Sequence, residues 1–172
     1  MSRYYVWRRG SRRHPRFRWP KLTVVCDIET HLWLAAYVCM GPCQDSPQFP
    51  EVVVPASRAV PIDVLLGDKG YDAEHNHRMC REELGIRRTW IPCRRRQRRS
   101  KHRLKWPTTQ YRREMRAAFD YAAYGQRWQA ESAFSQHKRR FGPALRARTW
   151  GMQQGEIYLR VLTHNVALLA AA

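Results

Sequence analysis

Apolar residues cluster in four short runs along the first half of the chain, and each run has the length of a strand. The first two, Leu22–Asp27 and His31–Cys39, are rich in β-branched and aromatic residues and are separated by three residues. So short a link favours an antiparallel hairpin. The later runs, Val64–Asp68 and Arg88–Pro92, predict two further strands.

Helical patterns lie between and after these strands. Residues 72–84 have apolar positions at helical spacing, with Asp72 as the cap and Gly85 as the stop. Later helices are predicted over 108–119, over 124–141, and from about residue 152 as a core helix. Together with the four strands, these helices give a mixed α/β order.

The segment from Asp45 to about Ser57 supports two interpretations. Asp45-Ser46-Pro47 is a plausible helix start, with a polar cap followed by proline in the first turn. The valines at 52–54, followed by Pro55, instead favour a short strand. The pattern alone leaves both open.

The net charge says more about function than the chain length does. The 172 residues suffice for one domain with its own core. With 32 Lys and Arg against 14 Asp and Glu, the net charge is +18, which indicates a polyanionic partner, most simply nucleic acid. An anionic membrane surface is the alternative, but it needs an amphipathic basic helix or a lipidation signal, and neither is evident. No apolar run approaches the roughly 20 residues of a membrane span.

The cysteines indicate thiols rather than a disulfide framework. There are five of them, an odd number, and no signal peptide precedes them, which predicts a reducing cytoplasm. His75, His77 and Cys80 are close enough in sequence to suggest zinc. No second ligand pair accompanies them, so we expect no zinc site.

Candidate chemistry lies at two strand ends and on one helix. Asp27 ends the first strand, and Asp68 ends the third and is followed by Lys69-Gly70-Tyr71-Asp72. If 124–138 forms one helix, four functional side chains share a face about 60° wide. They are Tyr124, Arg127, Glu131 and Lys138.

These residues together resemble the catalytic domain of the DDE transposases of bacterial insertion sequences that carry a Tyr-Arg-Glu-Lys signature. The resemblance covers about residues 21–165. It implies an RNase H-like mixed sheet flanked by helices over 22–172, and it favours a helix at 45–57. It also implies Mg²⁺-dependent cleavage of DNA, with Mn²⁺ able to substitute, and strand transfer by 3′-OH transesterification. DNA (transposon ends and target), a homodimer on DNA and a cytoplasmic, nucleoid-associated location follow from the same resemblance.

The resemblance also assigns roles to the residues. The catalytic, metal-holding carboxylates would be Asp27, Asp68 and Glu131. Phosphate-gripping groups would be Tyr124, Arg127 and Lys138, with Lys69 and Tyr71 helping to position the strand. Arg forks onto phosphate oxygens, Lys supplies a point charge and Tyr donates a hydrogen bond, so these side chains suit that task.

Two segments carry much of the excess charge. Residues 1–21 contain eight Lys and Arg, no acidic residue, and aromatic residues interleaved with the basic ones. This leader either binds DNA through phosphate contacts and base stacking or is disordered and solvated. Residues 94–105 hold eight more, which predicts an exposed basic loop over 94–107 that contacts phosphates or serves as a solvated linker. Its candidate DNA-binding residues are Arg94, Arg95, Arg96, Arg98 and Arg99.

A rival function shares the fold. Family transposases have a longer N-terminal region that binds transposon ends, whereas only 1–21 precedes the first aspartate here, so we expect that region to be lacking. The alternative is therefore a non-catalytic, basic DNA-binding remnant of a transposase. Among the remaining residues, Trp33, Trp90 and Trp128 are expected in the core. Acids such as Asp72 are expected to be surface or capping groups, and His31, His137 and His164 have no assigned partner.

Overall fold

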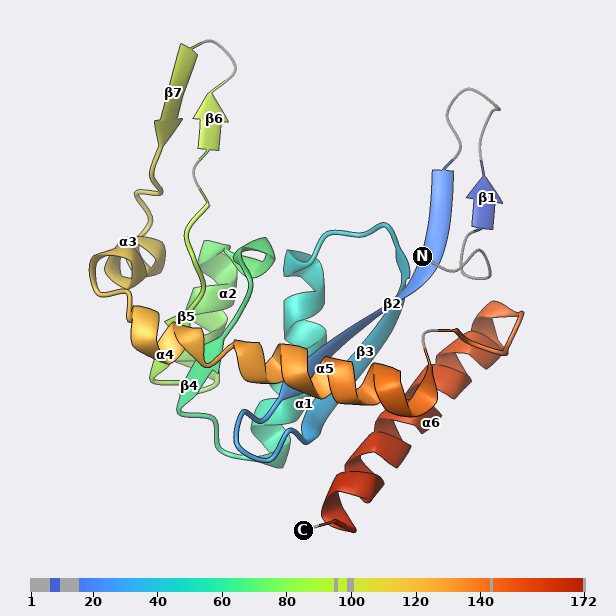
Figure 1. Cartoon of the computed structure of the whole chain (residues 1–172). Coiled ribbons are helices and arrows are strands. Elements are labelled where there is room, and N and C mark those ends of the chain that lie inside the picture. The colour runs from blue at the N-terminus through green and yellow to red at the C-terminus, as the bar shows by residue number, and fades with distance from the viewer. Residues whose placement is uncertain (1–6, 10–15, 95, 99–100, 143, 172) are drawn as a thin grey trace. The chain divides into compact units, whose positions relative to one another are not determined.

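The chain is a mixed α/β protein in a computed structural model that describes residues 7–9, 16–94, 96–98, 101–142 and 144–171. It divides into two compact units, the first made of 1–43 and 128–172 and the second of 44–127. The described strands form three small sheets, two antiparallel and one parallel (Figure 1). The α/β class is confirmed, whereas a single RNase H-like sheet stays a prediction.

The first unit is built on a long antiparallel hairpin. Its elements are β1 (Trp7–Arg9), β2 (Arg16–Cys26), β3 (Trp33–Gly41), α5 (Trp128–Phe141) and α6 (Trp150–Leu169). β2 pairs antiparallel with β3 from Trp19 opposite Gly41 to Cys26 opposite Trp33, which confirms the predicted hairpin. β2 begins before the expected Leu22, so part of the basic leader is strand. The rest of that leader, 1–6 and 10–15, lies outside the described residues.

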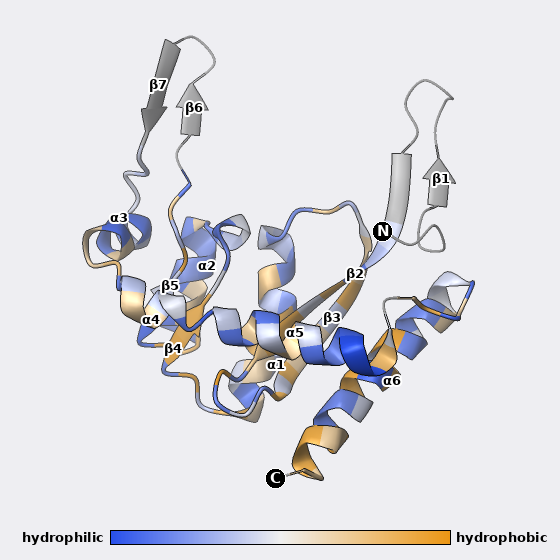
Figure 2. Ribbon diagram, viewed as in Figure 1, coloured by the Kyte–Doolittle hydropathy of each residue, from blue (hydrophilic) through white to orange (hydrophobic). Residues whose placement is uncertain are grey.

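The core of the first unit forms around Trp33. This side chain is 3% exposed, and its ring lies 5.0 Å from Phe134, 4.6 Å from His137 and 4.7 Å from His164. β3 therefore packs on α5 and α6 through one indole, and large aromatic contacts of this kind contribute strongly to a core. The assignment of Trp33 to the core is confirmed. Figure 2 shows β2 and β3 as largely apolar ribbons.

Side chains of α6 satisfy the backbone of β3. The side-chain amide of Asn165 accepts a hydrogen bond from Trp33 N and donates one to Trp33 O, both at 2.9 Å. Tyr158 Oη accepts from Val38 N at 3.3 Å, and Gln154 donates to Val38 O at 3.4 Å. Unpaired backbone groups are costly, so these contacts replace a neighbouring strand.

The C-terminal helix is less buried than a core helix. Within α6 the buried residues are Gln153, Ile157 and His164. Its exposed apolar side chains are Met152, Tyr158, Leu159, Leu162, Val166 and Leu169. The prediction of a core helix is thus wrong for most of its surface, because only one face meets the sheet. No helix in the part of the chain that the structure describes is long and apolar enough to cross a bilayer.

The second unit alternates short strands and helices. Its helices are α1 (Phe49–Ala59), α2 (Glu74–Arg78), α3 (Gln110–Ala117) and α4 (Tyr121–Gly125), with short helical turns η2 (Ser46–Gln48), η3 (Lys69–Tyr71) and η4 (Met79–Glu83). Its strands are β4 (Val64–Leu66), β5 (Arg88–Trp90), β6 (Arg96–Arg98) and β7 (Lys101–Lys105). The ambiguous 45–57 segment is helical, as the resemblance favoured. Phe49, Val52, Val53 and Ala56 are its buried residues.

The basic segment is a hairpin where a loop was expected. β6 and β7 pair antiparallel, with Arg96 opposite Lys105 and Gln97 opposite Leu104. Charge alone argued against regular structure here. Pairing of the two strands satisfies their backbone groups in spite of that charge. The predicted exposed loop over 94–107 is therefore wrong in its local structure.

Candidate active site

Asp68 stands at the end of β4, at the carboxyl edge of the parallel pair β4–β5. Gly67 N donates to Trp90 O at 3.0 Å, so the parallel pairing extends to the residue before the aspartate. Added at Gly67, a Cβ would lie 3.1 Å from Ile91 Cγ1, which explains why a glycine suits this position. Asp68 is the extended residue that begins η3, and its side chain is 60% exposed. This carboxylate is accessible from solvent.

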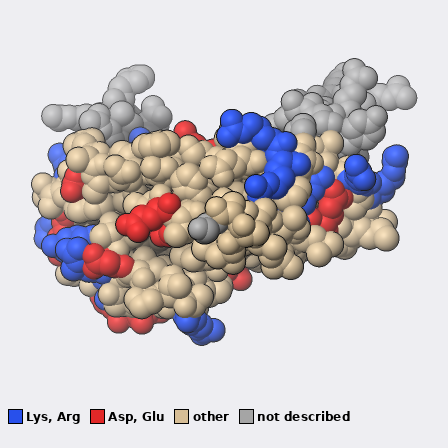
Figure 3. All heavy atoms as spheres, turned by 60° about the horizontal axis from the view of Figure 1, so that its bottom comes forward, with Lys and Arg blue, Asp and Glu red and all other residues tan. Residues whose placement is uncertain are grey.

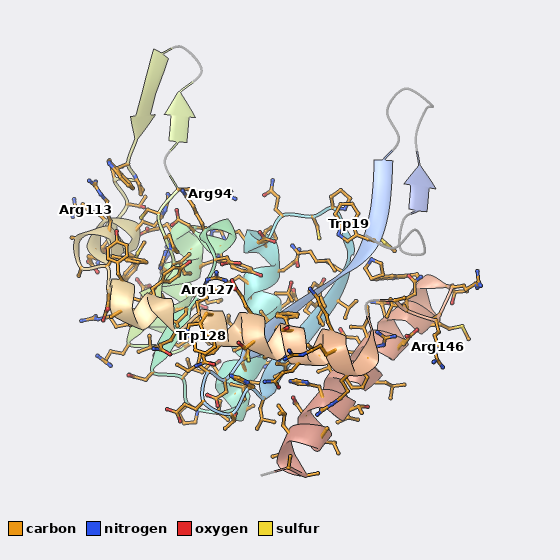
Figure 4. All side chains as sticks on the ribbon, viewed as in Figure 1. Trp19, Arg94, Arg113, Arg127, Trp128 and Arg146 are labelled. Atoms are coloured by element: carbon orange, nitrogen blue, oxygen red, sulfur yellow. The ribbon has the colours of Figure 1, made fainter. Side chains whose placement is uncertain are left out.

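Arg127 reaches Asp68. Its Nη1 atom lies 2.9 Å from Asp68 Oδ1, and the two side chains are 31% and 60% exposed. The Arg127 guanidinium also lies 5.9 Å from the ring centroid of Tyr124. Three residues that the sequence singled out thus meet in the second unit. Figure 4 labels Arg127 on the turn where it lies.

The helix expected over 124–138 is broken at this turn. α4 ends at Gly125, Arg127 N donates to Tyr124 O at 3.0 Å, and α5 begins at Trp128. Glycine within a helix is unfavourable by roughly 1 kcal/mol, which weakens the helix at this position. The expected single stripe is therefore wrong. Tyr124 and Arg127 belong to the second unit, and Glu131 and Lys138 to the first.

Aromatic contacts hold Tyr124 against the parallel pair. The ring of Phe119 lies 5.9 Å from that of buried Trp90 on β5 and 5.3 Å from that of Tyr124. Trp90, Phe119, Tyr124 and Arg127 therefore form a continuous series of contacts that leads from β5 to Asp68. Trp90 is a core residue, as predicted.

Asp72, four residues beyond Asp68, is a structural residue. Its side chain is fully buried, and it accepts hydrogen bonds from Arg112 Nε at 2.7 Å and Arg94 N at 2.5 Å. Burial alone would raise the pKa of Asp72, but its contacts with His77 and Arg112 lower it to about 2. The His77 Nε2 atom lies 3.6 Å away, beyond good hydrogen-bond distance. The expectation of a capping or surface aspartate is wrong, since Ala73 occupies the cap position.

The two other residues of the Asp68 segment differ in exposure. Lys69 is exposed, whereas Tyr71 is half-buried with its ring 5.6 Å from that of Phe49 on α1. Tyr71 N donates to Asp68 O at 2.9 Å, which closes η3 behind the aspartate. Tyr71 thus fixes the turn, and Lys69 is accessible to a ligand.

In the first unit, Asp27 organises the turn between β2 and β3. Its Oδ2 accepts hydrogen bonds from Thr30 N at 2.9 Å and from Thr30 Oγ1 at 2.5 Å. The Thr30 hydroxyl, which is the largest influence, lowers the pKa of Asp27 below its ordinary value. Asp27 is therefore an ionised, half-buried carboxylate whose Oδ2 holds the turn.

His31 joins this turn to α5. It has a φ of 62°, the left-handed region that few non-glycine residues adopt. Its Nε2 lies 2.8 Å from Gln129 Oε1, and Gln136 Nε2 lies 3.1 Å from its Nδ1. These two contacts fit the tautomer protonated at Nε2. The imidazole therefore ties the Asp27 turn to the helix that carries Glu131, a partnership that the sequence did not reveal.

Glu131 and Lys138 are both exposed on α5, in its first and last turns. Seven residues separate them, so they lie on one face of the helix. Trp128, at the start of α5, is 54% exposed, so its expected place in the core is wrong. Ala133 and His137 provide the buried face of this helix instead.

The basic residues are only partly described. Arg94 is exposed, and Arg96 and Arg98 lie on β6. Arg95 and Arg99 lie outside the described residues. On the face drawn in Figure 3, the described Lys and Arg side chains form separate groups, with acidic groups between them.

No ready-made metal cluster is found. Among the residues that the structure describes, no three His, Cys, Asp or Glu side chains are grouped so as to hold a metal ion. The expected lack of a zinc site at His75, His77 and Cys80 stays a prediction. The donor chemistry of the three candidate carboxylates still suits Mg²⁺, which prefers hard oxygen ligands and keeps several waters.

Comparison with known proteins gives one match. A family model described as the transposase DDE domain matches residues 3–166, nearly the whole chain. Neither the curated proteins nor the solved structures include a match.

Proposed function

Because the chain belongs to the transposase DDE domain family, we propose that it cleaves DNA strands and transfers them by attack of a 3′-OH on target DNA. The substrates are then the ends of an insertion sequence and a target duplex. Direct transesterification conserves the number of phosphodiester bonds, so no nucleotide cofactor is needed. Strand transfer acts on two transposon ends, and we expect a homodimer on DNA.

The contact between Arg127 and Asp68 carries this proposal. It brings an arginine of the Tyr-Arg-Glu-Lys signature to 2.9 Å from the aspartate that follows β4, although the two are 59 positions apart in the chain. Tyr124 of the same signature lies beside Arg127. A surface ion pair is weak by itself. Its value here is that it groups the same residues that the family resemblance assigns to one site.

The carboxylates Asp27, Asp68 and Glu131 are the residues that would hold metal. None of the three is buried, and the lowered pKa of Asp27 keeps it in the charged form that a cation needs. Bound Mg²⁺ or Mn²⁺ would activate the attacking oxygen and neutralise charge on the leaving oxygen. Arg127, Tyr124 and Lys138 would orient the phosphates of the cleaved strand, and Lys69 would help to position that strand.

Basic side chains outside the carboxylates would provide affinity for the duplex. The net charge of +18 is far larger than one strand end requires, and phosphate contacts supply affinity without reading sequence. We assign this role to the segment from Arg94 to Lys105. The RNase H-like arrangement of strands is part of the same proposal.

Cleavage of supercoiled plasmid with Mn²⁺ tests the function. The wild-type chain should nick the plasmid, and Asp68→Ala and Glu131→Gln should not, while both variants keep their affinity for DNA. Glu82→Gln is the matched control, since Glu82 is an exposed carboxylate that bonds Tyr111 and has no proposed role. If the two variants nick as fast as the wild type, the metal assignment is wrong.

The non-catalytic DNA-binding remnant is the second candidate. In this candidate the net charge of +18 serves DNA binding alone. It predicts binding to duplex DNA with no metal-dependent nicking by any form of the chain. The same plasmid assay therefore separates the two functions.

A further inference from the structure

Two cysteine thiols touch at the end of the β2–β3 hairpin that is remote from Asp27. The Sγ atoms of Cys39 and Cys43 are 3.0 Å apart. Cys39 lies in β3, and Cys43 follows the end of that strand by two residues. The chain turns back after Gly41 and places the second thiol against the first. The sequence predicted thiols at these positions and no pairing between them.

Lys21 fixes both cysteines. On β2 it stands opposite Cys39 in the antiparallel ladder, and its Nζ donates to the carbonyl oxygen of Cys43 at 3.3 Å. One lysine thus holds one cysteine through backbone pairing and the other through its side chain. The contact between the sulfurs therefore belongs to an ordered hairpin end.

The remaining cysteines are protected from reaction. Burial raises the pKa of Cys26 and of Cys80 to about 12 and the pKa of Cys93 to about 11. The thiolate is the reactive form of cysteine, so a raised pKa suppresses reaction at neutral pH. Cys43 is exposed, whereas Cys26, Cys39 and Cys93 are half-buried and Cys80 is buried. A reagent in solution therefore reaches Cys43 first.

We propose that Cys39 and Cys43 form a reversible dithiol–disulfide site whose oxidant is a small disulfide of the glutathione type. The Cys43 thiol loses its proton and attacks one sulfur of the oxidant, which releases one small thiol and leaves a mixed disulfide. The Cys39 thiol then loses its proton and attacks the sulfur of Cys43, which releases the second small thiol. Two protein thiols are oxidised to one disulfide, the small disulfide is reduced to two thiols, and the protons pass to those thiols.

The geometry suits the second attack. A disulfide has its sulfurs about 2.05 Å apart, so the pair must close by only about 1 Å. Lys21 lies six positions before Asp27, about 20 Å at the rise of a strand. Oxidation at this end should therefore leave the Asp27 turn in place, which makes the site independent of the proposed catalysis.

The test treats the whole chain with oxidised glutathione, blocks the remaining thiols under denaturing conditions, and measures the intact mass. We expect an internal disulfide without bound glutathione, and three of the five thiols still open to alkylation. Dithiothreitol should restore all five. A stable glutathione adduct on the wild-type chain, or five alkylated thiols after oxidation, would overturn the proposal.

Single substitutions identify the partners. Cys26→Ser, the matched control on β2, should still lose two thiols. Cys39→Ser should instead retain one glutathione on Cys43, and Cys43→Ser should form no internal disulfide. Loss of the disulfide in Cys26→Ser, or its persistence in Cys43→Ser, would mean that a different pair reacts. Circular dichroism of each serine variant checks that it is folded.

Discussion

Arg127 and Asp68 form an ion pair at 2.9 Å, although one lies in the turn after α4 and the other at the end of β4. This ion pair competes with the proposed roles of both residues. As a proposed metal ligand, Asp68 must bind a metal cation. Its carboxylate is less available to that cation while it is paired with the guanidinium of Arg127. Arg127 needs an anion, and a DNA phosphate offers one. Binding of DNA and metal should therefore exchange the two partners.

Arg127→Gln tests this exchange by removing the competing cation. We expect Mn²⁺ to bind up to about fivefold more tightly, since an exposed ion pair contributes at most about 1 kcal/mol. DNA affinity should fall, and the salt dependence of binding should decrease by about one counterion. Isothermal titration with Mn²⁺ and fluorescence anisotropy with labelled duplex measure the two effects. Arg113→Gln on α3, an exposed arginine outside the site, is the control. Unchanged values in both assays would contradict the exchange.

The ion pair of Arg112 with Asp72 should contribute to stability instead. Asp72 is completely buried and Arg112 is 14% exposed. Arg112→Met leaves a buried, uncompensated carboxylate and should reduce the free energy of unfolding by about 3–5 kcal/mol. Asp72→Asn should cost less, because the arginine that remains is closer to solvent. Urea denaturation followed by circular dichroism measures both.

The exposed pair of Arg87 with Asp63 supplies the control for that comparison. It has two charge-assisted hydrogen bonds, at 2.7 and 2.6 Å, but both side chains are 63% exposed. Arg87→Met should therefore destabilise the protein much less than Arg112→Met does, because solvent screens an exposed pair. Equal losses in the two arginine variants would show that burial does not govern the Asp72 pair.

His31 should position the turn that carries Asp27. His31→Gly keeps the left-handed backbone but removes the contacts with Gln129 and Gln136. We expect the rate of plasmid nicking to fall about 10- to 100-fold with DNA affinity unchanged. His31→Asn, which tolerates the same backbone region and keeps a hydrogen-bonding side chain, should recover part of the rate. Ser135→Ala, an exposed site on α5, is the control.

A purely structural role for His31 makes a different prediction. Both variants would then lose rate and thermal stability in parallel, and DNA affinity would fall with them. The split between rate and affinity, together with the partial recovery in His31→Asn, is therefore the result that supports positioning.

Local patterns predicted much of this fold, and contacts distant in sequence limited the rest. The hairpin of β2 and β3 followed from two apolar runs and a short link, because both strands are adjacent in the chain. The helix stop predicted at Gly85 coincides with a left-handed glycine, at a φ of 68°. The break after Gly125 was missed because helical spacing continues across it, and periodicity does not report which residues pack on which unit.

The sequence indicated which residues belong to the candidate site, but it did not predict their burial or their partners. Asp68 and Asp72 are only four residues apart, and their sequence surroundings do not distinguish them. The side chain of Asp68 is nevertheless exposed, whereas that of Asp72 is completely buried. That difference is set by Arg112, which lies 40 positions after Asp72. His31 was missed for the same reason, since its partners are about 100 residues away. A buried partner leaves no local signal.

Mild acid should destabilise the first unit through the histidines around Trp33. Burial lowers the pKa of His137 from 6.5 to about 4 and also lowers the pKa of His164. Below about pH 6.5, these two histidines are therefore protonated in the unfolded chain but stay neutral in the native state. Stability should therefore fall as pH drops from about 6.5 to 4, by an amount on the order of 2 kcal/mol. His137→Leu should flatten this slope in urea denaturation, and His75→Leu, at an exposed histidine, should not. Loss of stability that begins only below pH 4, where carboxylates such as Asp72 titrate, would instead assign the acid sensitivity to the second unit.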